Sequence, residues 1–177
     1  MKRRKLKIDI LTLLSILLIA TFFFKTTEKE LDPMSGKLAM ECEKRFFGII
    51  ETCTTYSNNG KVSIIERYRM KKLDGDLVSY YENGQLEFII EYKNNKIWNI
   101  KEYYDIDGNK LNFGTLKNGE GELLIYSSQG NLRSRGRVMA GYKHGIWYEY
   151  NDAGLLDSVL YSRGYRDELP FLDNILY

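Results

Sequence analysis

Few side chains in this sequence are suited to catalysis or to metal binding. The chain has one histidine, His144, and two cysteines, Cys42 and Cys53. A Ser-His-Asp triad would have to use His144, and zinc sites built from several His or four Cys are excluded. His144 lies in a Gly-rich segment that reads as a solvated turn. We therefore expect no catalytic residue, no cofactor and no metal site.

The two cysteines form a candidate disulfide. Cys42 and Cys53 are eleven positions apart, and a bridge that closes a loop of this size gains about 2–3 kcal/mol in the chain-entropy model. The alternative is a pair of free, buried thiols, which holds if the domain is cytoplasmic. The disulfide is favoured, because the N-terminal segment predicts export.

Aromatic residues supply the other candidates for function. All 14 Tyr lie at or after Tyr56. Tyr and Trp dominate many protein interfaces, although they also pack thin sheets while keeping a polar atom in water. The aligned tyrosines of the second repeat signal are expected to pack, namely Tyr80, Tyr103, Tyr126 and Tyr150. The candidate partner-binding residues are Tyr81, Trp98, Tyr104 and Tyr148.

A repeat of about 24 residues must position these side chains. A Tyr four residues before a Gly occurs five times, and the Gly positions are separated by 24, 24, 22 and 24 residues. A second signal, Gly-x-Leu/Trp-x-x-Tyr, lies between these turns. The five Tyr are Tyr56, Tyr80, Tyr104, Tyr126 and Tyr150. The third repeat departs from the pattern, because Leu111 comes one residue later than its counterparts.

The segments between the turns alternate as β-strands do. Leu86, Phe88, Ile90 and Tyr92 share one face of their run, and such period-two runs of β-branched and aromatic residues are typical of strands. Asn, Asp and Gly at the turns suit tight hairpins. The sequence predicts an all-β fold, one elongated, open antiparallel β-meander built from about five hairpin repeats.

Both motifs resemble the MORN-repeat-variant family, often grouped with the YwqK-type antitoxins. The resemblance covers residues 56–165, and residues 136–154 look like a complete unit. It implies an elongated, open β-meander whose members act in binding and assembly. It supplies no catalytic residue to carry over.

The first 25 residues differ from the rest of the chain. They hold six Lys or Arg and one Asp, a net charge of +5, whereas residues 26–177 carry −3. Residues 10–24 contain no charge. This pattern predicts a transmembrane signal anchor, with a cleaved secretory signal as the alternative. The run covers only about 22 Å of the roughly 30 Å hydrocarbon core. The positive-inside rule places the repeats outside the membrane.

The chain is thereby divided into five parts. We expect a basic, membrane-inserted helix over residues 1–25, a linker over 26–37, a capping segment with a degenerate hairpin over 38–55, the repeats over 56–165 and a C-terminal cap over 166–177. Pro170 breaks the strand pattern near the end.

These features favour a non-enzymatic, membrane-anchored repeat domain that binds or scaffolds a protein or an envelope component. The alternative is an antitoxin or immunity protein that neutralises a cognate toxin by binding it. An envelope-modifying enzyme would need a polar cluster that the sequence does not supply. Nucleic acid is not expected as a partner, because 26 basic residues are balanced by 24 acidic ones.

Overall fold

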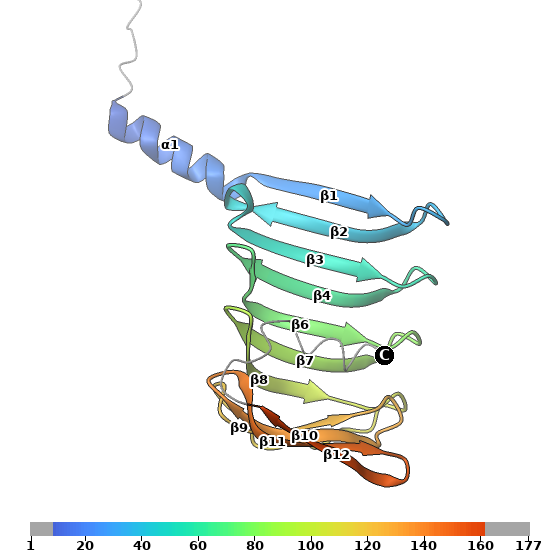
Figure 1. Ribbon diagram of the computed structural model, residues 1–177. Helices are drawn as coiled ribbons and strands as arrows, with labels where there is room; N and C mark the ends of the chain where they lie inside the picture. The colour runs from blue at the N-terminus through green and yellow to red at the C-terminus, as the bar shows by residue number, and fades with distance from the viewer. Residues whose placement is uncertain (1–8, 162–177) are drawn as a thin grey trace, which may run out of the picture.

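The computed structural model describes residues 9–161, and it shows a ladder of antiparallel strands that follow one another in chain order (Figure 1). An eight-stranded sheet comes first. It contains β1 (Lys25–Leu31), β2 (Leu38–Arg45), β3 (Ile50–Tyr56), β4 (Val62–Arg69), β5 (Lys72–Leu73), β6 (Gly75–Tyr80), β7 (Leu86–Lys93) and β8 (Lys96–Tyr103). A four-stranded sheet follows. Its strands are β9 (Gly121–Tyr126), β10 (Leu132–Met139), β11 (Tyr142–Asn151) and β12 (Gly154–Tyr161). The predicted all-β antiparallel meander is confirmed.

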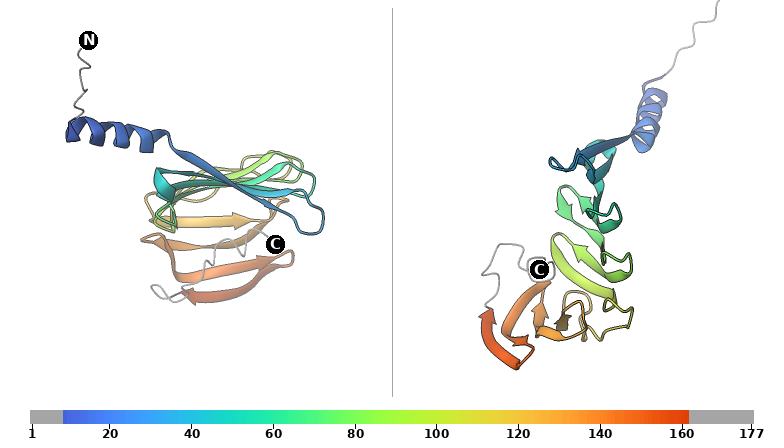
Figure 2. Two further views of the ribbon diagram at one scale, coloured as in Figure 1. Left: turned by 90° about the horizontal axis from the view of Figure 1, so that it is seen from above. Right: turned by 90° about the vertical axis from the view of Figure 1, so that its right-hand side faces the viewer.

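The meander is divided into two sheets, whereas the sequence predicts one. Residues 104–120 form only isolated bridges, including Gly114 with Leu123. Asn112 Oδ1 accepts a hydrogen bond from Gly114 N (3.0 Å), and Gly114 has a φ of +92°. This left-handed kink ends the extended conformation where a strand would continue. The second sheet consequently turns away from the plane of the first (Figure 2). The break lies in the repeat that departs from the 24-residue spacing.

Two kinds of turn connect the strands. Two-residue turns with positive φ at both positions lie at one end of the ladder, which is the geometry that fits the twist of hairpin strands. They are 70–71, 94–95, 118–119 and 140–141. Longer turns join the strands at the other end, and Gly84 N donates to Tyr81 O (2.8 Å) in one of them. The turn signals in the sequence therefore correspond to hairpins of two alternating lengths.

Hydrogen bonds between successive repeats join the turns into a stack. Gly141 N donates to Gly119 O (2.9 Å), and Gly119 N donates to Trp98 O (2.8 Å). At the other end, the hydroxyl of Tyr103 donates to Tyr126 O (3.2 Å), 23 residues further along. Each repeat thus satisfies buried polar groups of its neighbour.

The hydrophobic core lies where the second sheet meets the last strands of the first. Leu77, Phe88 and Ile90 from the first sheet and Leu123 and Trp147 from the second belong to one buried cluster. The alternation predicted for residues 86–92 is observed, because Phe88, Ile90 and Tyr92 are buried while Glu87, Ile89 and Glu91 are half-buried. Among the described residues, strands β1–β3 add no member to this cluster.

The N-terminal part departs from the expected linker and cap. Residues 26–37 were expected to be a linker, but Lys25–Leu31 forms β1, the edge strand of the first sheet. Its charges pair across to β2, as Lys29 does with Glu41 (3.6 Å). Such an edge strand is exposed on both faces and therefore carries no apolar alternation. The hairpin expected in residues 38–55 is present as β2 and β3, while β1 forms the edge.

The apolar run near the N-terminus forms helix α1 (Ile10–Phe23), which projects from the first sheet (Figure 1). The carboxylate of Asp9 caps it by accepting from Thr12 N (2.7 Å). Within residues 9–161, no helix has both the length and the apolar character needed to cross a membrane. The expected C-terminal cap, residues 166–177, lies outside the described residues.

Candidate partner-binding surface

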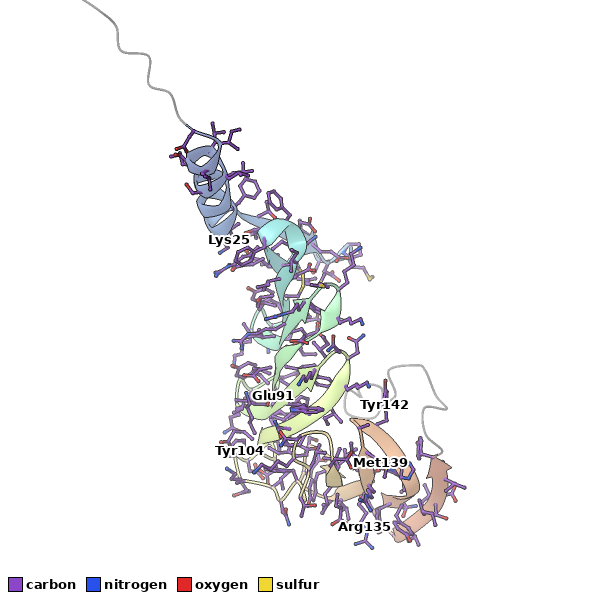
Figure 3. The ribbon with its side chains drawn as sticks, turned by 90° about the vertical axis from the view of Figure 1, so that its left-hand side faces the viewer. Lys25, Glu91, Tyr104, Arg135, Met139 and Tyr142 are labelled. Atoms are coloured by element: carbon purple, nitrogen blue, oxygen red, sulfur yellow. A yellow bond between two sulfur atoms is a disulfide. The ribbon has the colours of Figure 1, made fainter. Side chains whose placement is uncertain are left out.

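Strand β10 carries a row of arginines on one face. Arg133, Arg135 and Arg137 alternate with Ser134, Gly136 and Val138, which are buried against the core. Because side chains alternate along a strand, the three arginines share the surface that faces away from the first sheet. Arg135 lies there at the lower edge of the molecule (Figure 3). We call this surface of β9–β12 the outer face.

A shallow hollow of about 540 Å³ lies on the outer face over β9, β10 and β11. Glycines contribute backbone but no side chain to its lining, and they leave room between the arginines and the next strand. The lining residues are Thr115, Gly121, Glu122, Arg135, Gly136, Arg137, Ile146 and Tyr148. The hollow therefore combines two cations, one carboxylate, an aliphatic side chain and an aromatic ring.

Gly136 is required by the packing beneath the hollow. A Cβ atom at this position would lie 2.4 Å from Cγ and Cδ2 of Trp147. The Trp147 side chain is fully buried, at 0% exposure, and its Nε1 donates to Arg137 O (3.0 Å). The indole thus occupies the space of a side chain at Gly136 and fixes the backbone of β10 beside it.

The arginines differ in their counter-ions. Arg133 pairs with Asp152 (3.1 Å) at the margin of the outer face. Arg135 lies over the ring of Tyr148, with 5.4 Å between the guanidinium carbon and the ring centroid. Among residues 9–161, no carboxylate lies within ion-pair distance of Arg135 or Arg137, nor a cation within that distance of Glu122. Neither guanidinium thus forms an ion pair within this range, while Glu122 lies opposite Arg137 in the register of β9 and β10.

Exposed aliphatic side chains adjoin the hollow. Ile146 on β11 is 52% exposed and pairs in register with Leu160 on β12, which is 75% exposed. Leu155 and Leu156, at the start of β12, are also exposed. Contiguous apolar groups on a surface mark candidate interaction sites. The outer face thus has a basic half over β10 and an apolar half over β11 and β12.

The four aromatic candidates do not form one site. Tyr81 is buried, and its hydroxyl donates to Tyr104 O (2.9 Å), so it connects two repeats and is not available to a partner. Its burial depends on packing between repeats, which the sequence of one repeat does not show. Tyr104 donates to Glu102 Oε2 (2.8 Å). Trp98 lies on β8 with Lys93 Nζ 4.7 Å from its ring centroid.

Tyr148 alone among these candidates lines the hollow. Sequence reasoning missed Arg135, Arg137 and Glu122, which surround it. The alternation Arg-Ser-Arg-Gly-Arg over residues 133–137 was the available signal, since it places the three cations on one face of a strand.

The structure joins Cys42 and Cys53 by a disulfide between directly paired positions of β2 and β3. Glu51 lies close to both sulfur atoms. Bonded sulfurs are not thiolates, and the three side chains therefore do not form a fitting donor set for a metal ion. His144 lies within β11 and not in the turn that the sequence suggests.

Comparison with known families gives one match. The sequence model of the MORN repeat variant family matches residues 73–94, which cover β6, β7 and the turn between them. No curated protein matches the chain.

Proposed function

We propose that this chain, which contains a MORN repeat variant over residues 73–94, is a non-enzymatic binding domain that holds a protein partner on the outer face of β9–β12. The observation that carries the proposal is the exposed apolar group formed by Ile146 and Leu160 beside the hollow. A MORN repeat variant supports a role in binding. On the outer face, exposed apolar side chains adjoin the hollow.

The contrast between the two ends of the ladder supports this choice. The edge strand β1 has the sequence KTTEKEL, and its charged side chains pair with β2. Charged residues of this kind protect a sheet edge from other chains. The opposite edge strand, β12, has the sequence GLLDSVLY with a single charge. An edge with few charges and exposed leucines favours association with a partner.

The proposal includes attachment of the domain to a membrane. Its support is the +5 charge of residues 1–25 and the uncharged run over residues 10–24, with export favoured by the disulfide. A fusion of periplasm-active alkaline phosphatase after Tyr177 is expected to be active. A stable but inactive fusion would contradict the extracytoplasmic orientation. Processing at the N-terminus would distinguish the cleaved signal from the anchor.

Capture with matched variants tests the binding surface. The full chain is immobilised, and the proteins it retains are compared with those retained by Ile146→Glu and Leu160→Glu. Leu31→Glu is the control, because Leu31 is also an exposed leucine of an edge strand (58%) but lies at the opposite end of the ladder. We expect the partner to be retained by the wild type and the control and lost with both outer-face variants. Equal retention by all four proteins would refute the proposal.

A cognate toxin is one class of protein partner that this experiment can reveal. If the retained protein is a toxin, deletion of this chain with the toxin intact is expected to reduce viability. If the deletion is harmless, the antitoxin hypothesis is wrong, while binding at the outer face remains supported.

A further inference from the structure

From the hollow in the outer face we infer the chemistry of the partner: it presents an extended, acidic segment whose carboxylates bind Arg135 and Arg137 and whose aliphatic side chains pack on Ile146 and Leu160. The inference rests on the proposed function and names the ligand class of that same surface. Three features of the hollow carry it: the spacing of the cations, the absence within residues 9–161 of an ion pair on either guanidinium, and the apolar strip beside them.

The spacing of the two arginines matches an extended peptide. Arg135 and Arg137 are alternate residues of β10 on the same face, so their Cα atoms lie about 6.5–7 Å apart. Alternate side chains of an extended ligand have the same spacing. Two acidic residues at positions i and i+2 of the ligand can therefore each meet one guanidinium. The planar guanidinium group also matches a carboxylate through two parallel hydrogen bonds.

The two cations are exposed, and their surroundings hold them in place, although Glu122 lies opposite Arg137 in the register of β9 and β10. Arg135 lies over the Tyr148 ring (5.4 Å), which restricts its side chain before a ligand arrives. The backbone of Arg137 is fixed by the indole of Trp147 (3.0 Å). Within residues 9–161 neither guanidinium has a carboxylate partner, so an acidic ligand would not displace an existing ion pair.

The neighbouring strand supplies the apolar part of the surface. Tyr148 pairs in register with Arg135, and Ile146 pairs with Leu160 on the next strand. The aliphatic groups therefore lie beside the arginines, one and two strands away at about 4.8 Å per strand, and a ligand along β10 reaches them with long side chains on its side toward β11. A ligand with carboxylates alone would leave these side chains in water.

A protein segment suits this surface better than a nucleic acid or an anionic membrane. Both of the latter require a broad row of cations, whereas the hollow has two, with Glu122 beside them. Residues 26–177 carry a net charge of −3, which repels a polyanion at longer range. Glu122 lies opposite Arg137 in the strand register, and its charge disfavours a dense row of phosphates more than a segment with two carboxylates.

The test uses the full chain and a fluorescein-labelled nonapeptide. Its odd positions are Leu, Leu, Glu, Glu and Leu and its even positions are Ser, so that one face of the extended peptide presents both chemistries. A second peptide has Gln in place of both Glu. Fluorescence anisotropy is expected to show at least about ten-fold tighter binding of the Glu peptide, with the difference reduced by salt. Equal affinities, or no binding of the Glu peptide, would overturn the inference.

Variants locate the binding within the hollow. The double variant R135Q/R137Q is expected to weaken binding of the Glu peptide about ten-fold or more and to leave the Gln peptide unaffected. Arg133→Gln is the matched control on the same strand, since Arg133 already pairs with Asp152 and does not line the hollow. An equal effect of Arg133→Gln and the double variant would overturn the inference. Both changes are at the surface, and near-ultraviolet circular dichroism verifies the fold.

Competition with other anions distinguishes the ligand classes. A single-stranded DNA oligonucleotide and vesicles containing phosphatidylglycerol are added to the labelled Glu peptide. We expect neither to displace the labelled peptide at low salt. Displacement by either at a lower concentration than the unlabelled peptide would contradict a protein ligand.

The proposed binding surface and its proposed acidic ligand can be refuted independently of each other. If Ile146→Glu abolishes partner capture and R135Q/R137Q does not, the binding surface stands and its acidic ligand is refuted.

Discussion

Substitution of Gly136 by alanine tests how tightly the second sheet is packed behind the hollow. A Cβ at Gly136 would lie 2.4 Å from Cγ and Cδ2 of Trp147 and 2.6 Å from Cδ1, whereas ordinary carbon contacts are about 3.5–4.0 Å. Unlike most glycines of this chain, Gly136 has a φ outside the left-handed region. The backbone therefore accepts alanine, and the clash alone determines the cost.

The expected cost follows from two terms. Overpacking a rigid site costs about 1–3 kcal/mol. Moving the indole also weakens the hydrogen bond from Trp147 Nε1 to Arg137 O (3.0 Å), which contributes about 1 kcal/mol. The indole has little room to move, because Tyr161 packs edge-on against it with the ring centroids 6.2 Å apart. We expect Gly136→Ala to lower the free energy of unfolding by roughly 2–4 kcal/mol.

A double-mutant cycle separates this clash from other effects. Urea unfolding is measured for the wild type, Gly136→Ala, Trp147→Leu and the double variant. The smaller leucine leaves space for a Cβ, so Gly136→Ala is expected to cost less than about 1 kcal/mol in the Trp147→Leu background. The same loss in both backgrounds, or a loss below about 0.5 kcal/mol in the wild type, would refute the proposed packing.

Three further predictions concern the first sheet and the stack of repeats. Replacing Cys42 and Cys53 by alanine should lower the free energy of unfolding by about 3 kcal/mol, because the disulfide between them closes a loop in the unfolded chain. Urea unfolding measures this loss, and an unchanged free energy of unfolding would contradict the prediction. Tyr103→Phe removes a hydroxyl that accepts from Tyr126 N (3.0 Å) and should cost roughly 1–3 kcal/mol, with faster hydrogen exchange at that amide; unchanged exchange would be the contrary result. Burial raises the pKa of Glu87, so the folded state binds its proton more tightly and stability falls as pH rises through the pKa. Glu87→Gln should therefore raise the melting temperature near neutral pH but not below about pH 4, and an equal gain at both pH values would refute this explanation.

Much of the local structure could be predicted from the sequence. The turns after the recurring tyrosines were identified because Gly and Asn favour the positive φ that turns require, as at Gly60, Gly84 and Gly130 (81°, 92° and 79°). The strands were identified because side chains of opposite character alternate with a period of two, as in β7. The turn residues and the alternation within strands both depend only on residues that are close in sequence.

Candidate residues for the site were harder to predict because their value depends on which strands lie next to one another. Tyr81 and Tyr148 are both tyrosines within the repeats, yet the first is buried between repeats and the second lines the hollow. The polar sequence of β1 gave no strand signal, since both faces of that edge are exposed and the charges pair only with β2. These outcomes depend on packing and pairing partners.

The sequence by itself determined the repeat, the antiparallel order of the strands and the turn positions, because each depends on short-range periodicity and backbone preference. Only the tertiary structure decided the division into two sheets, where the kink at Gly114 turns the chain. It also decided the hollow, since Arg135, Glu122 and Ile146 belong to three strands and meet only through pairing register. The pairing register of the strands and the curvature of the sheets arise from contacts between residues that are distant in sequence. The alternation of side chains along a single strand carries no information about either.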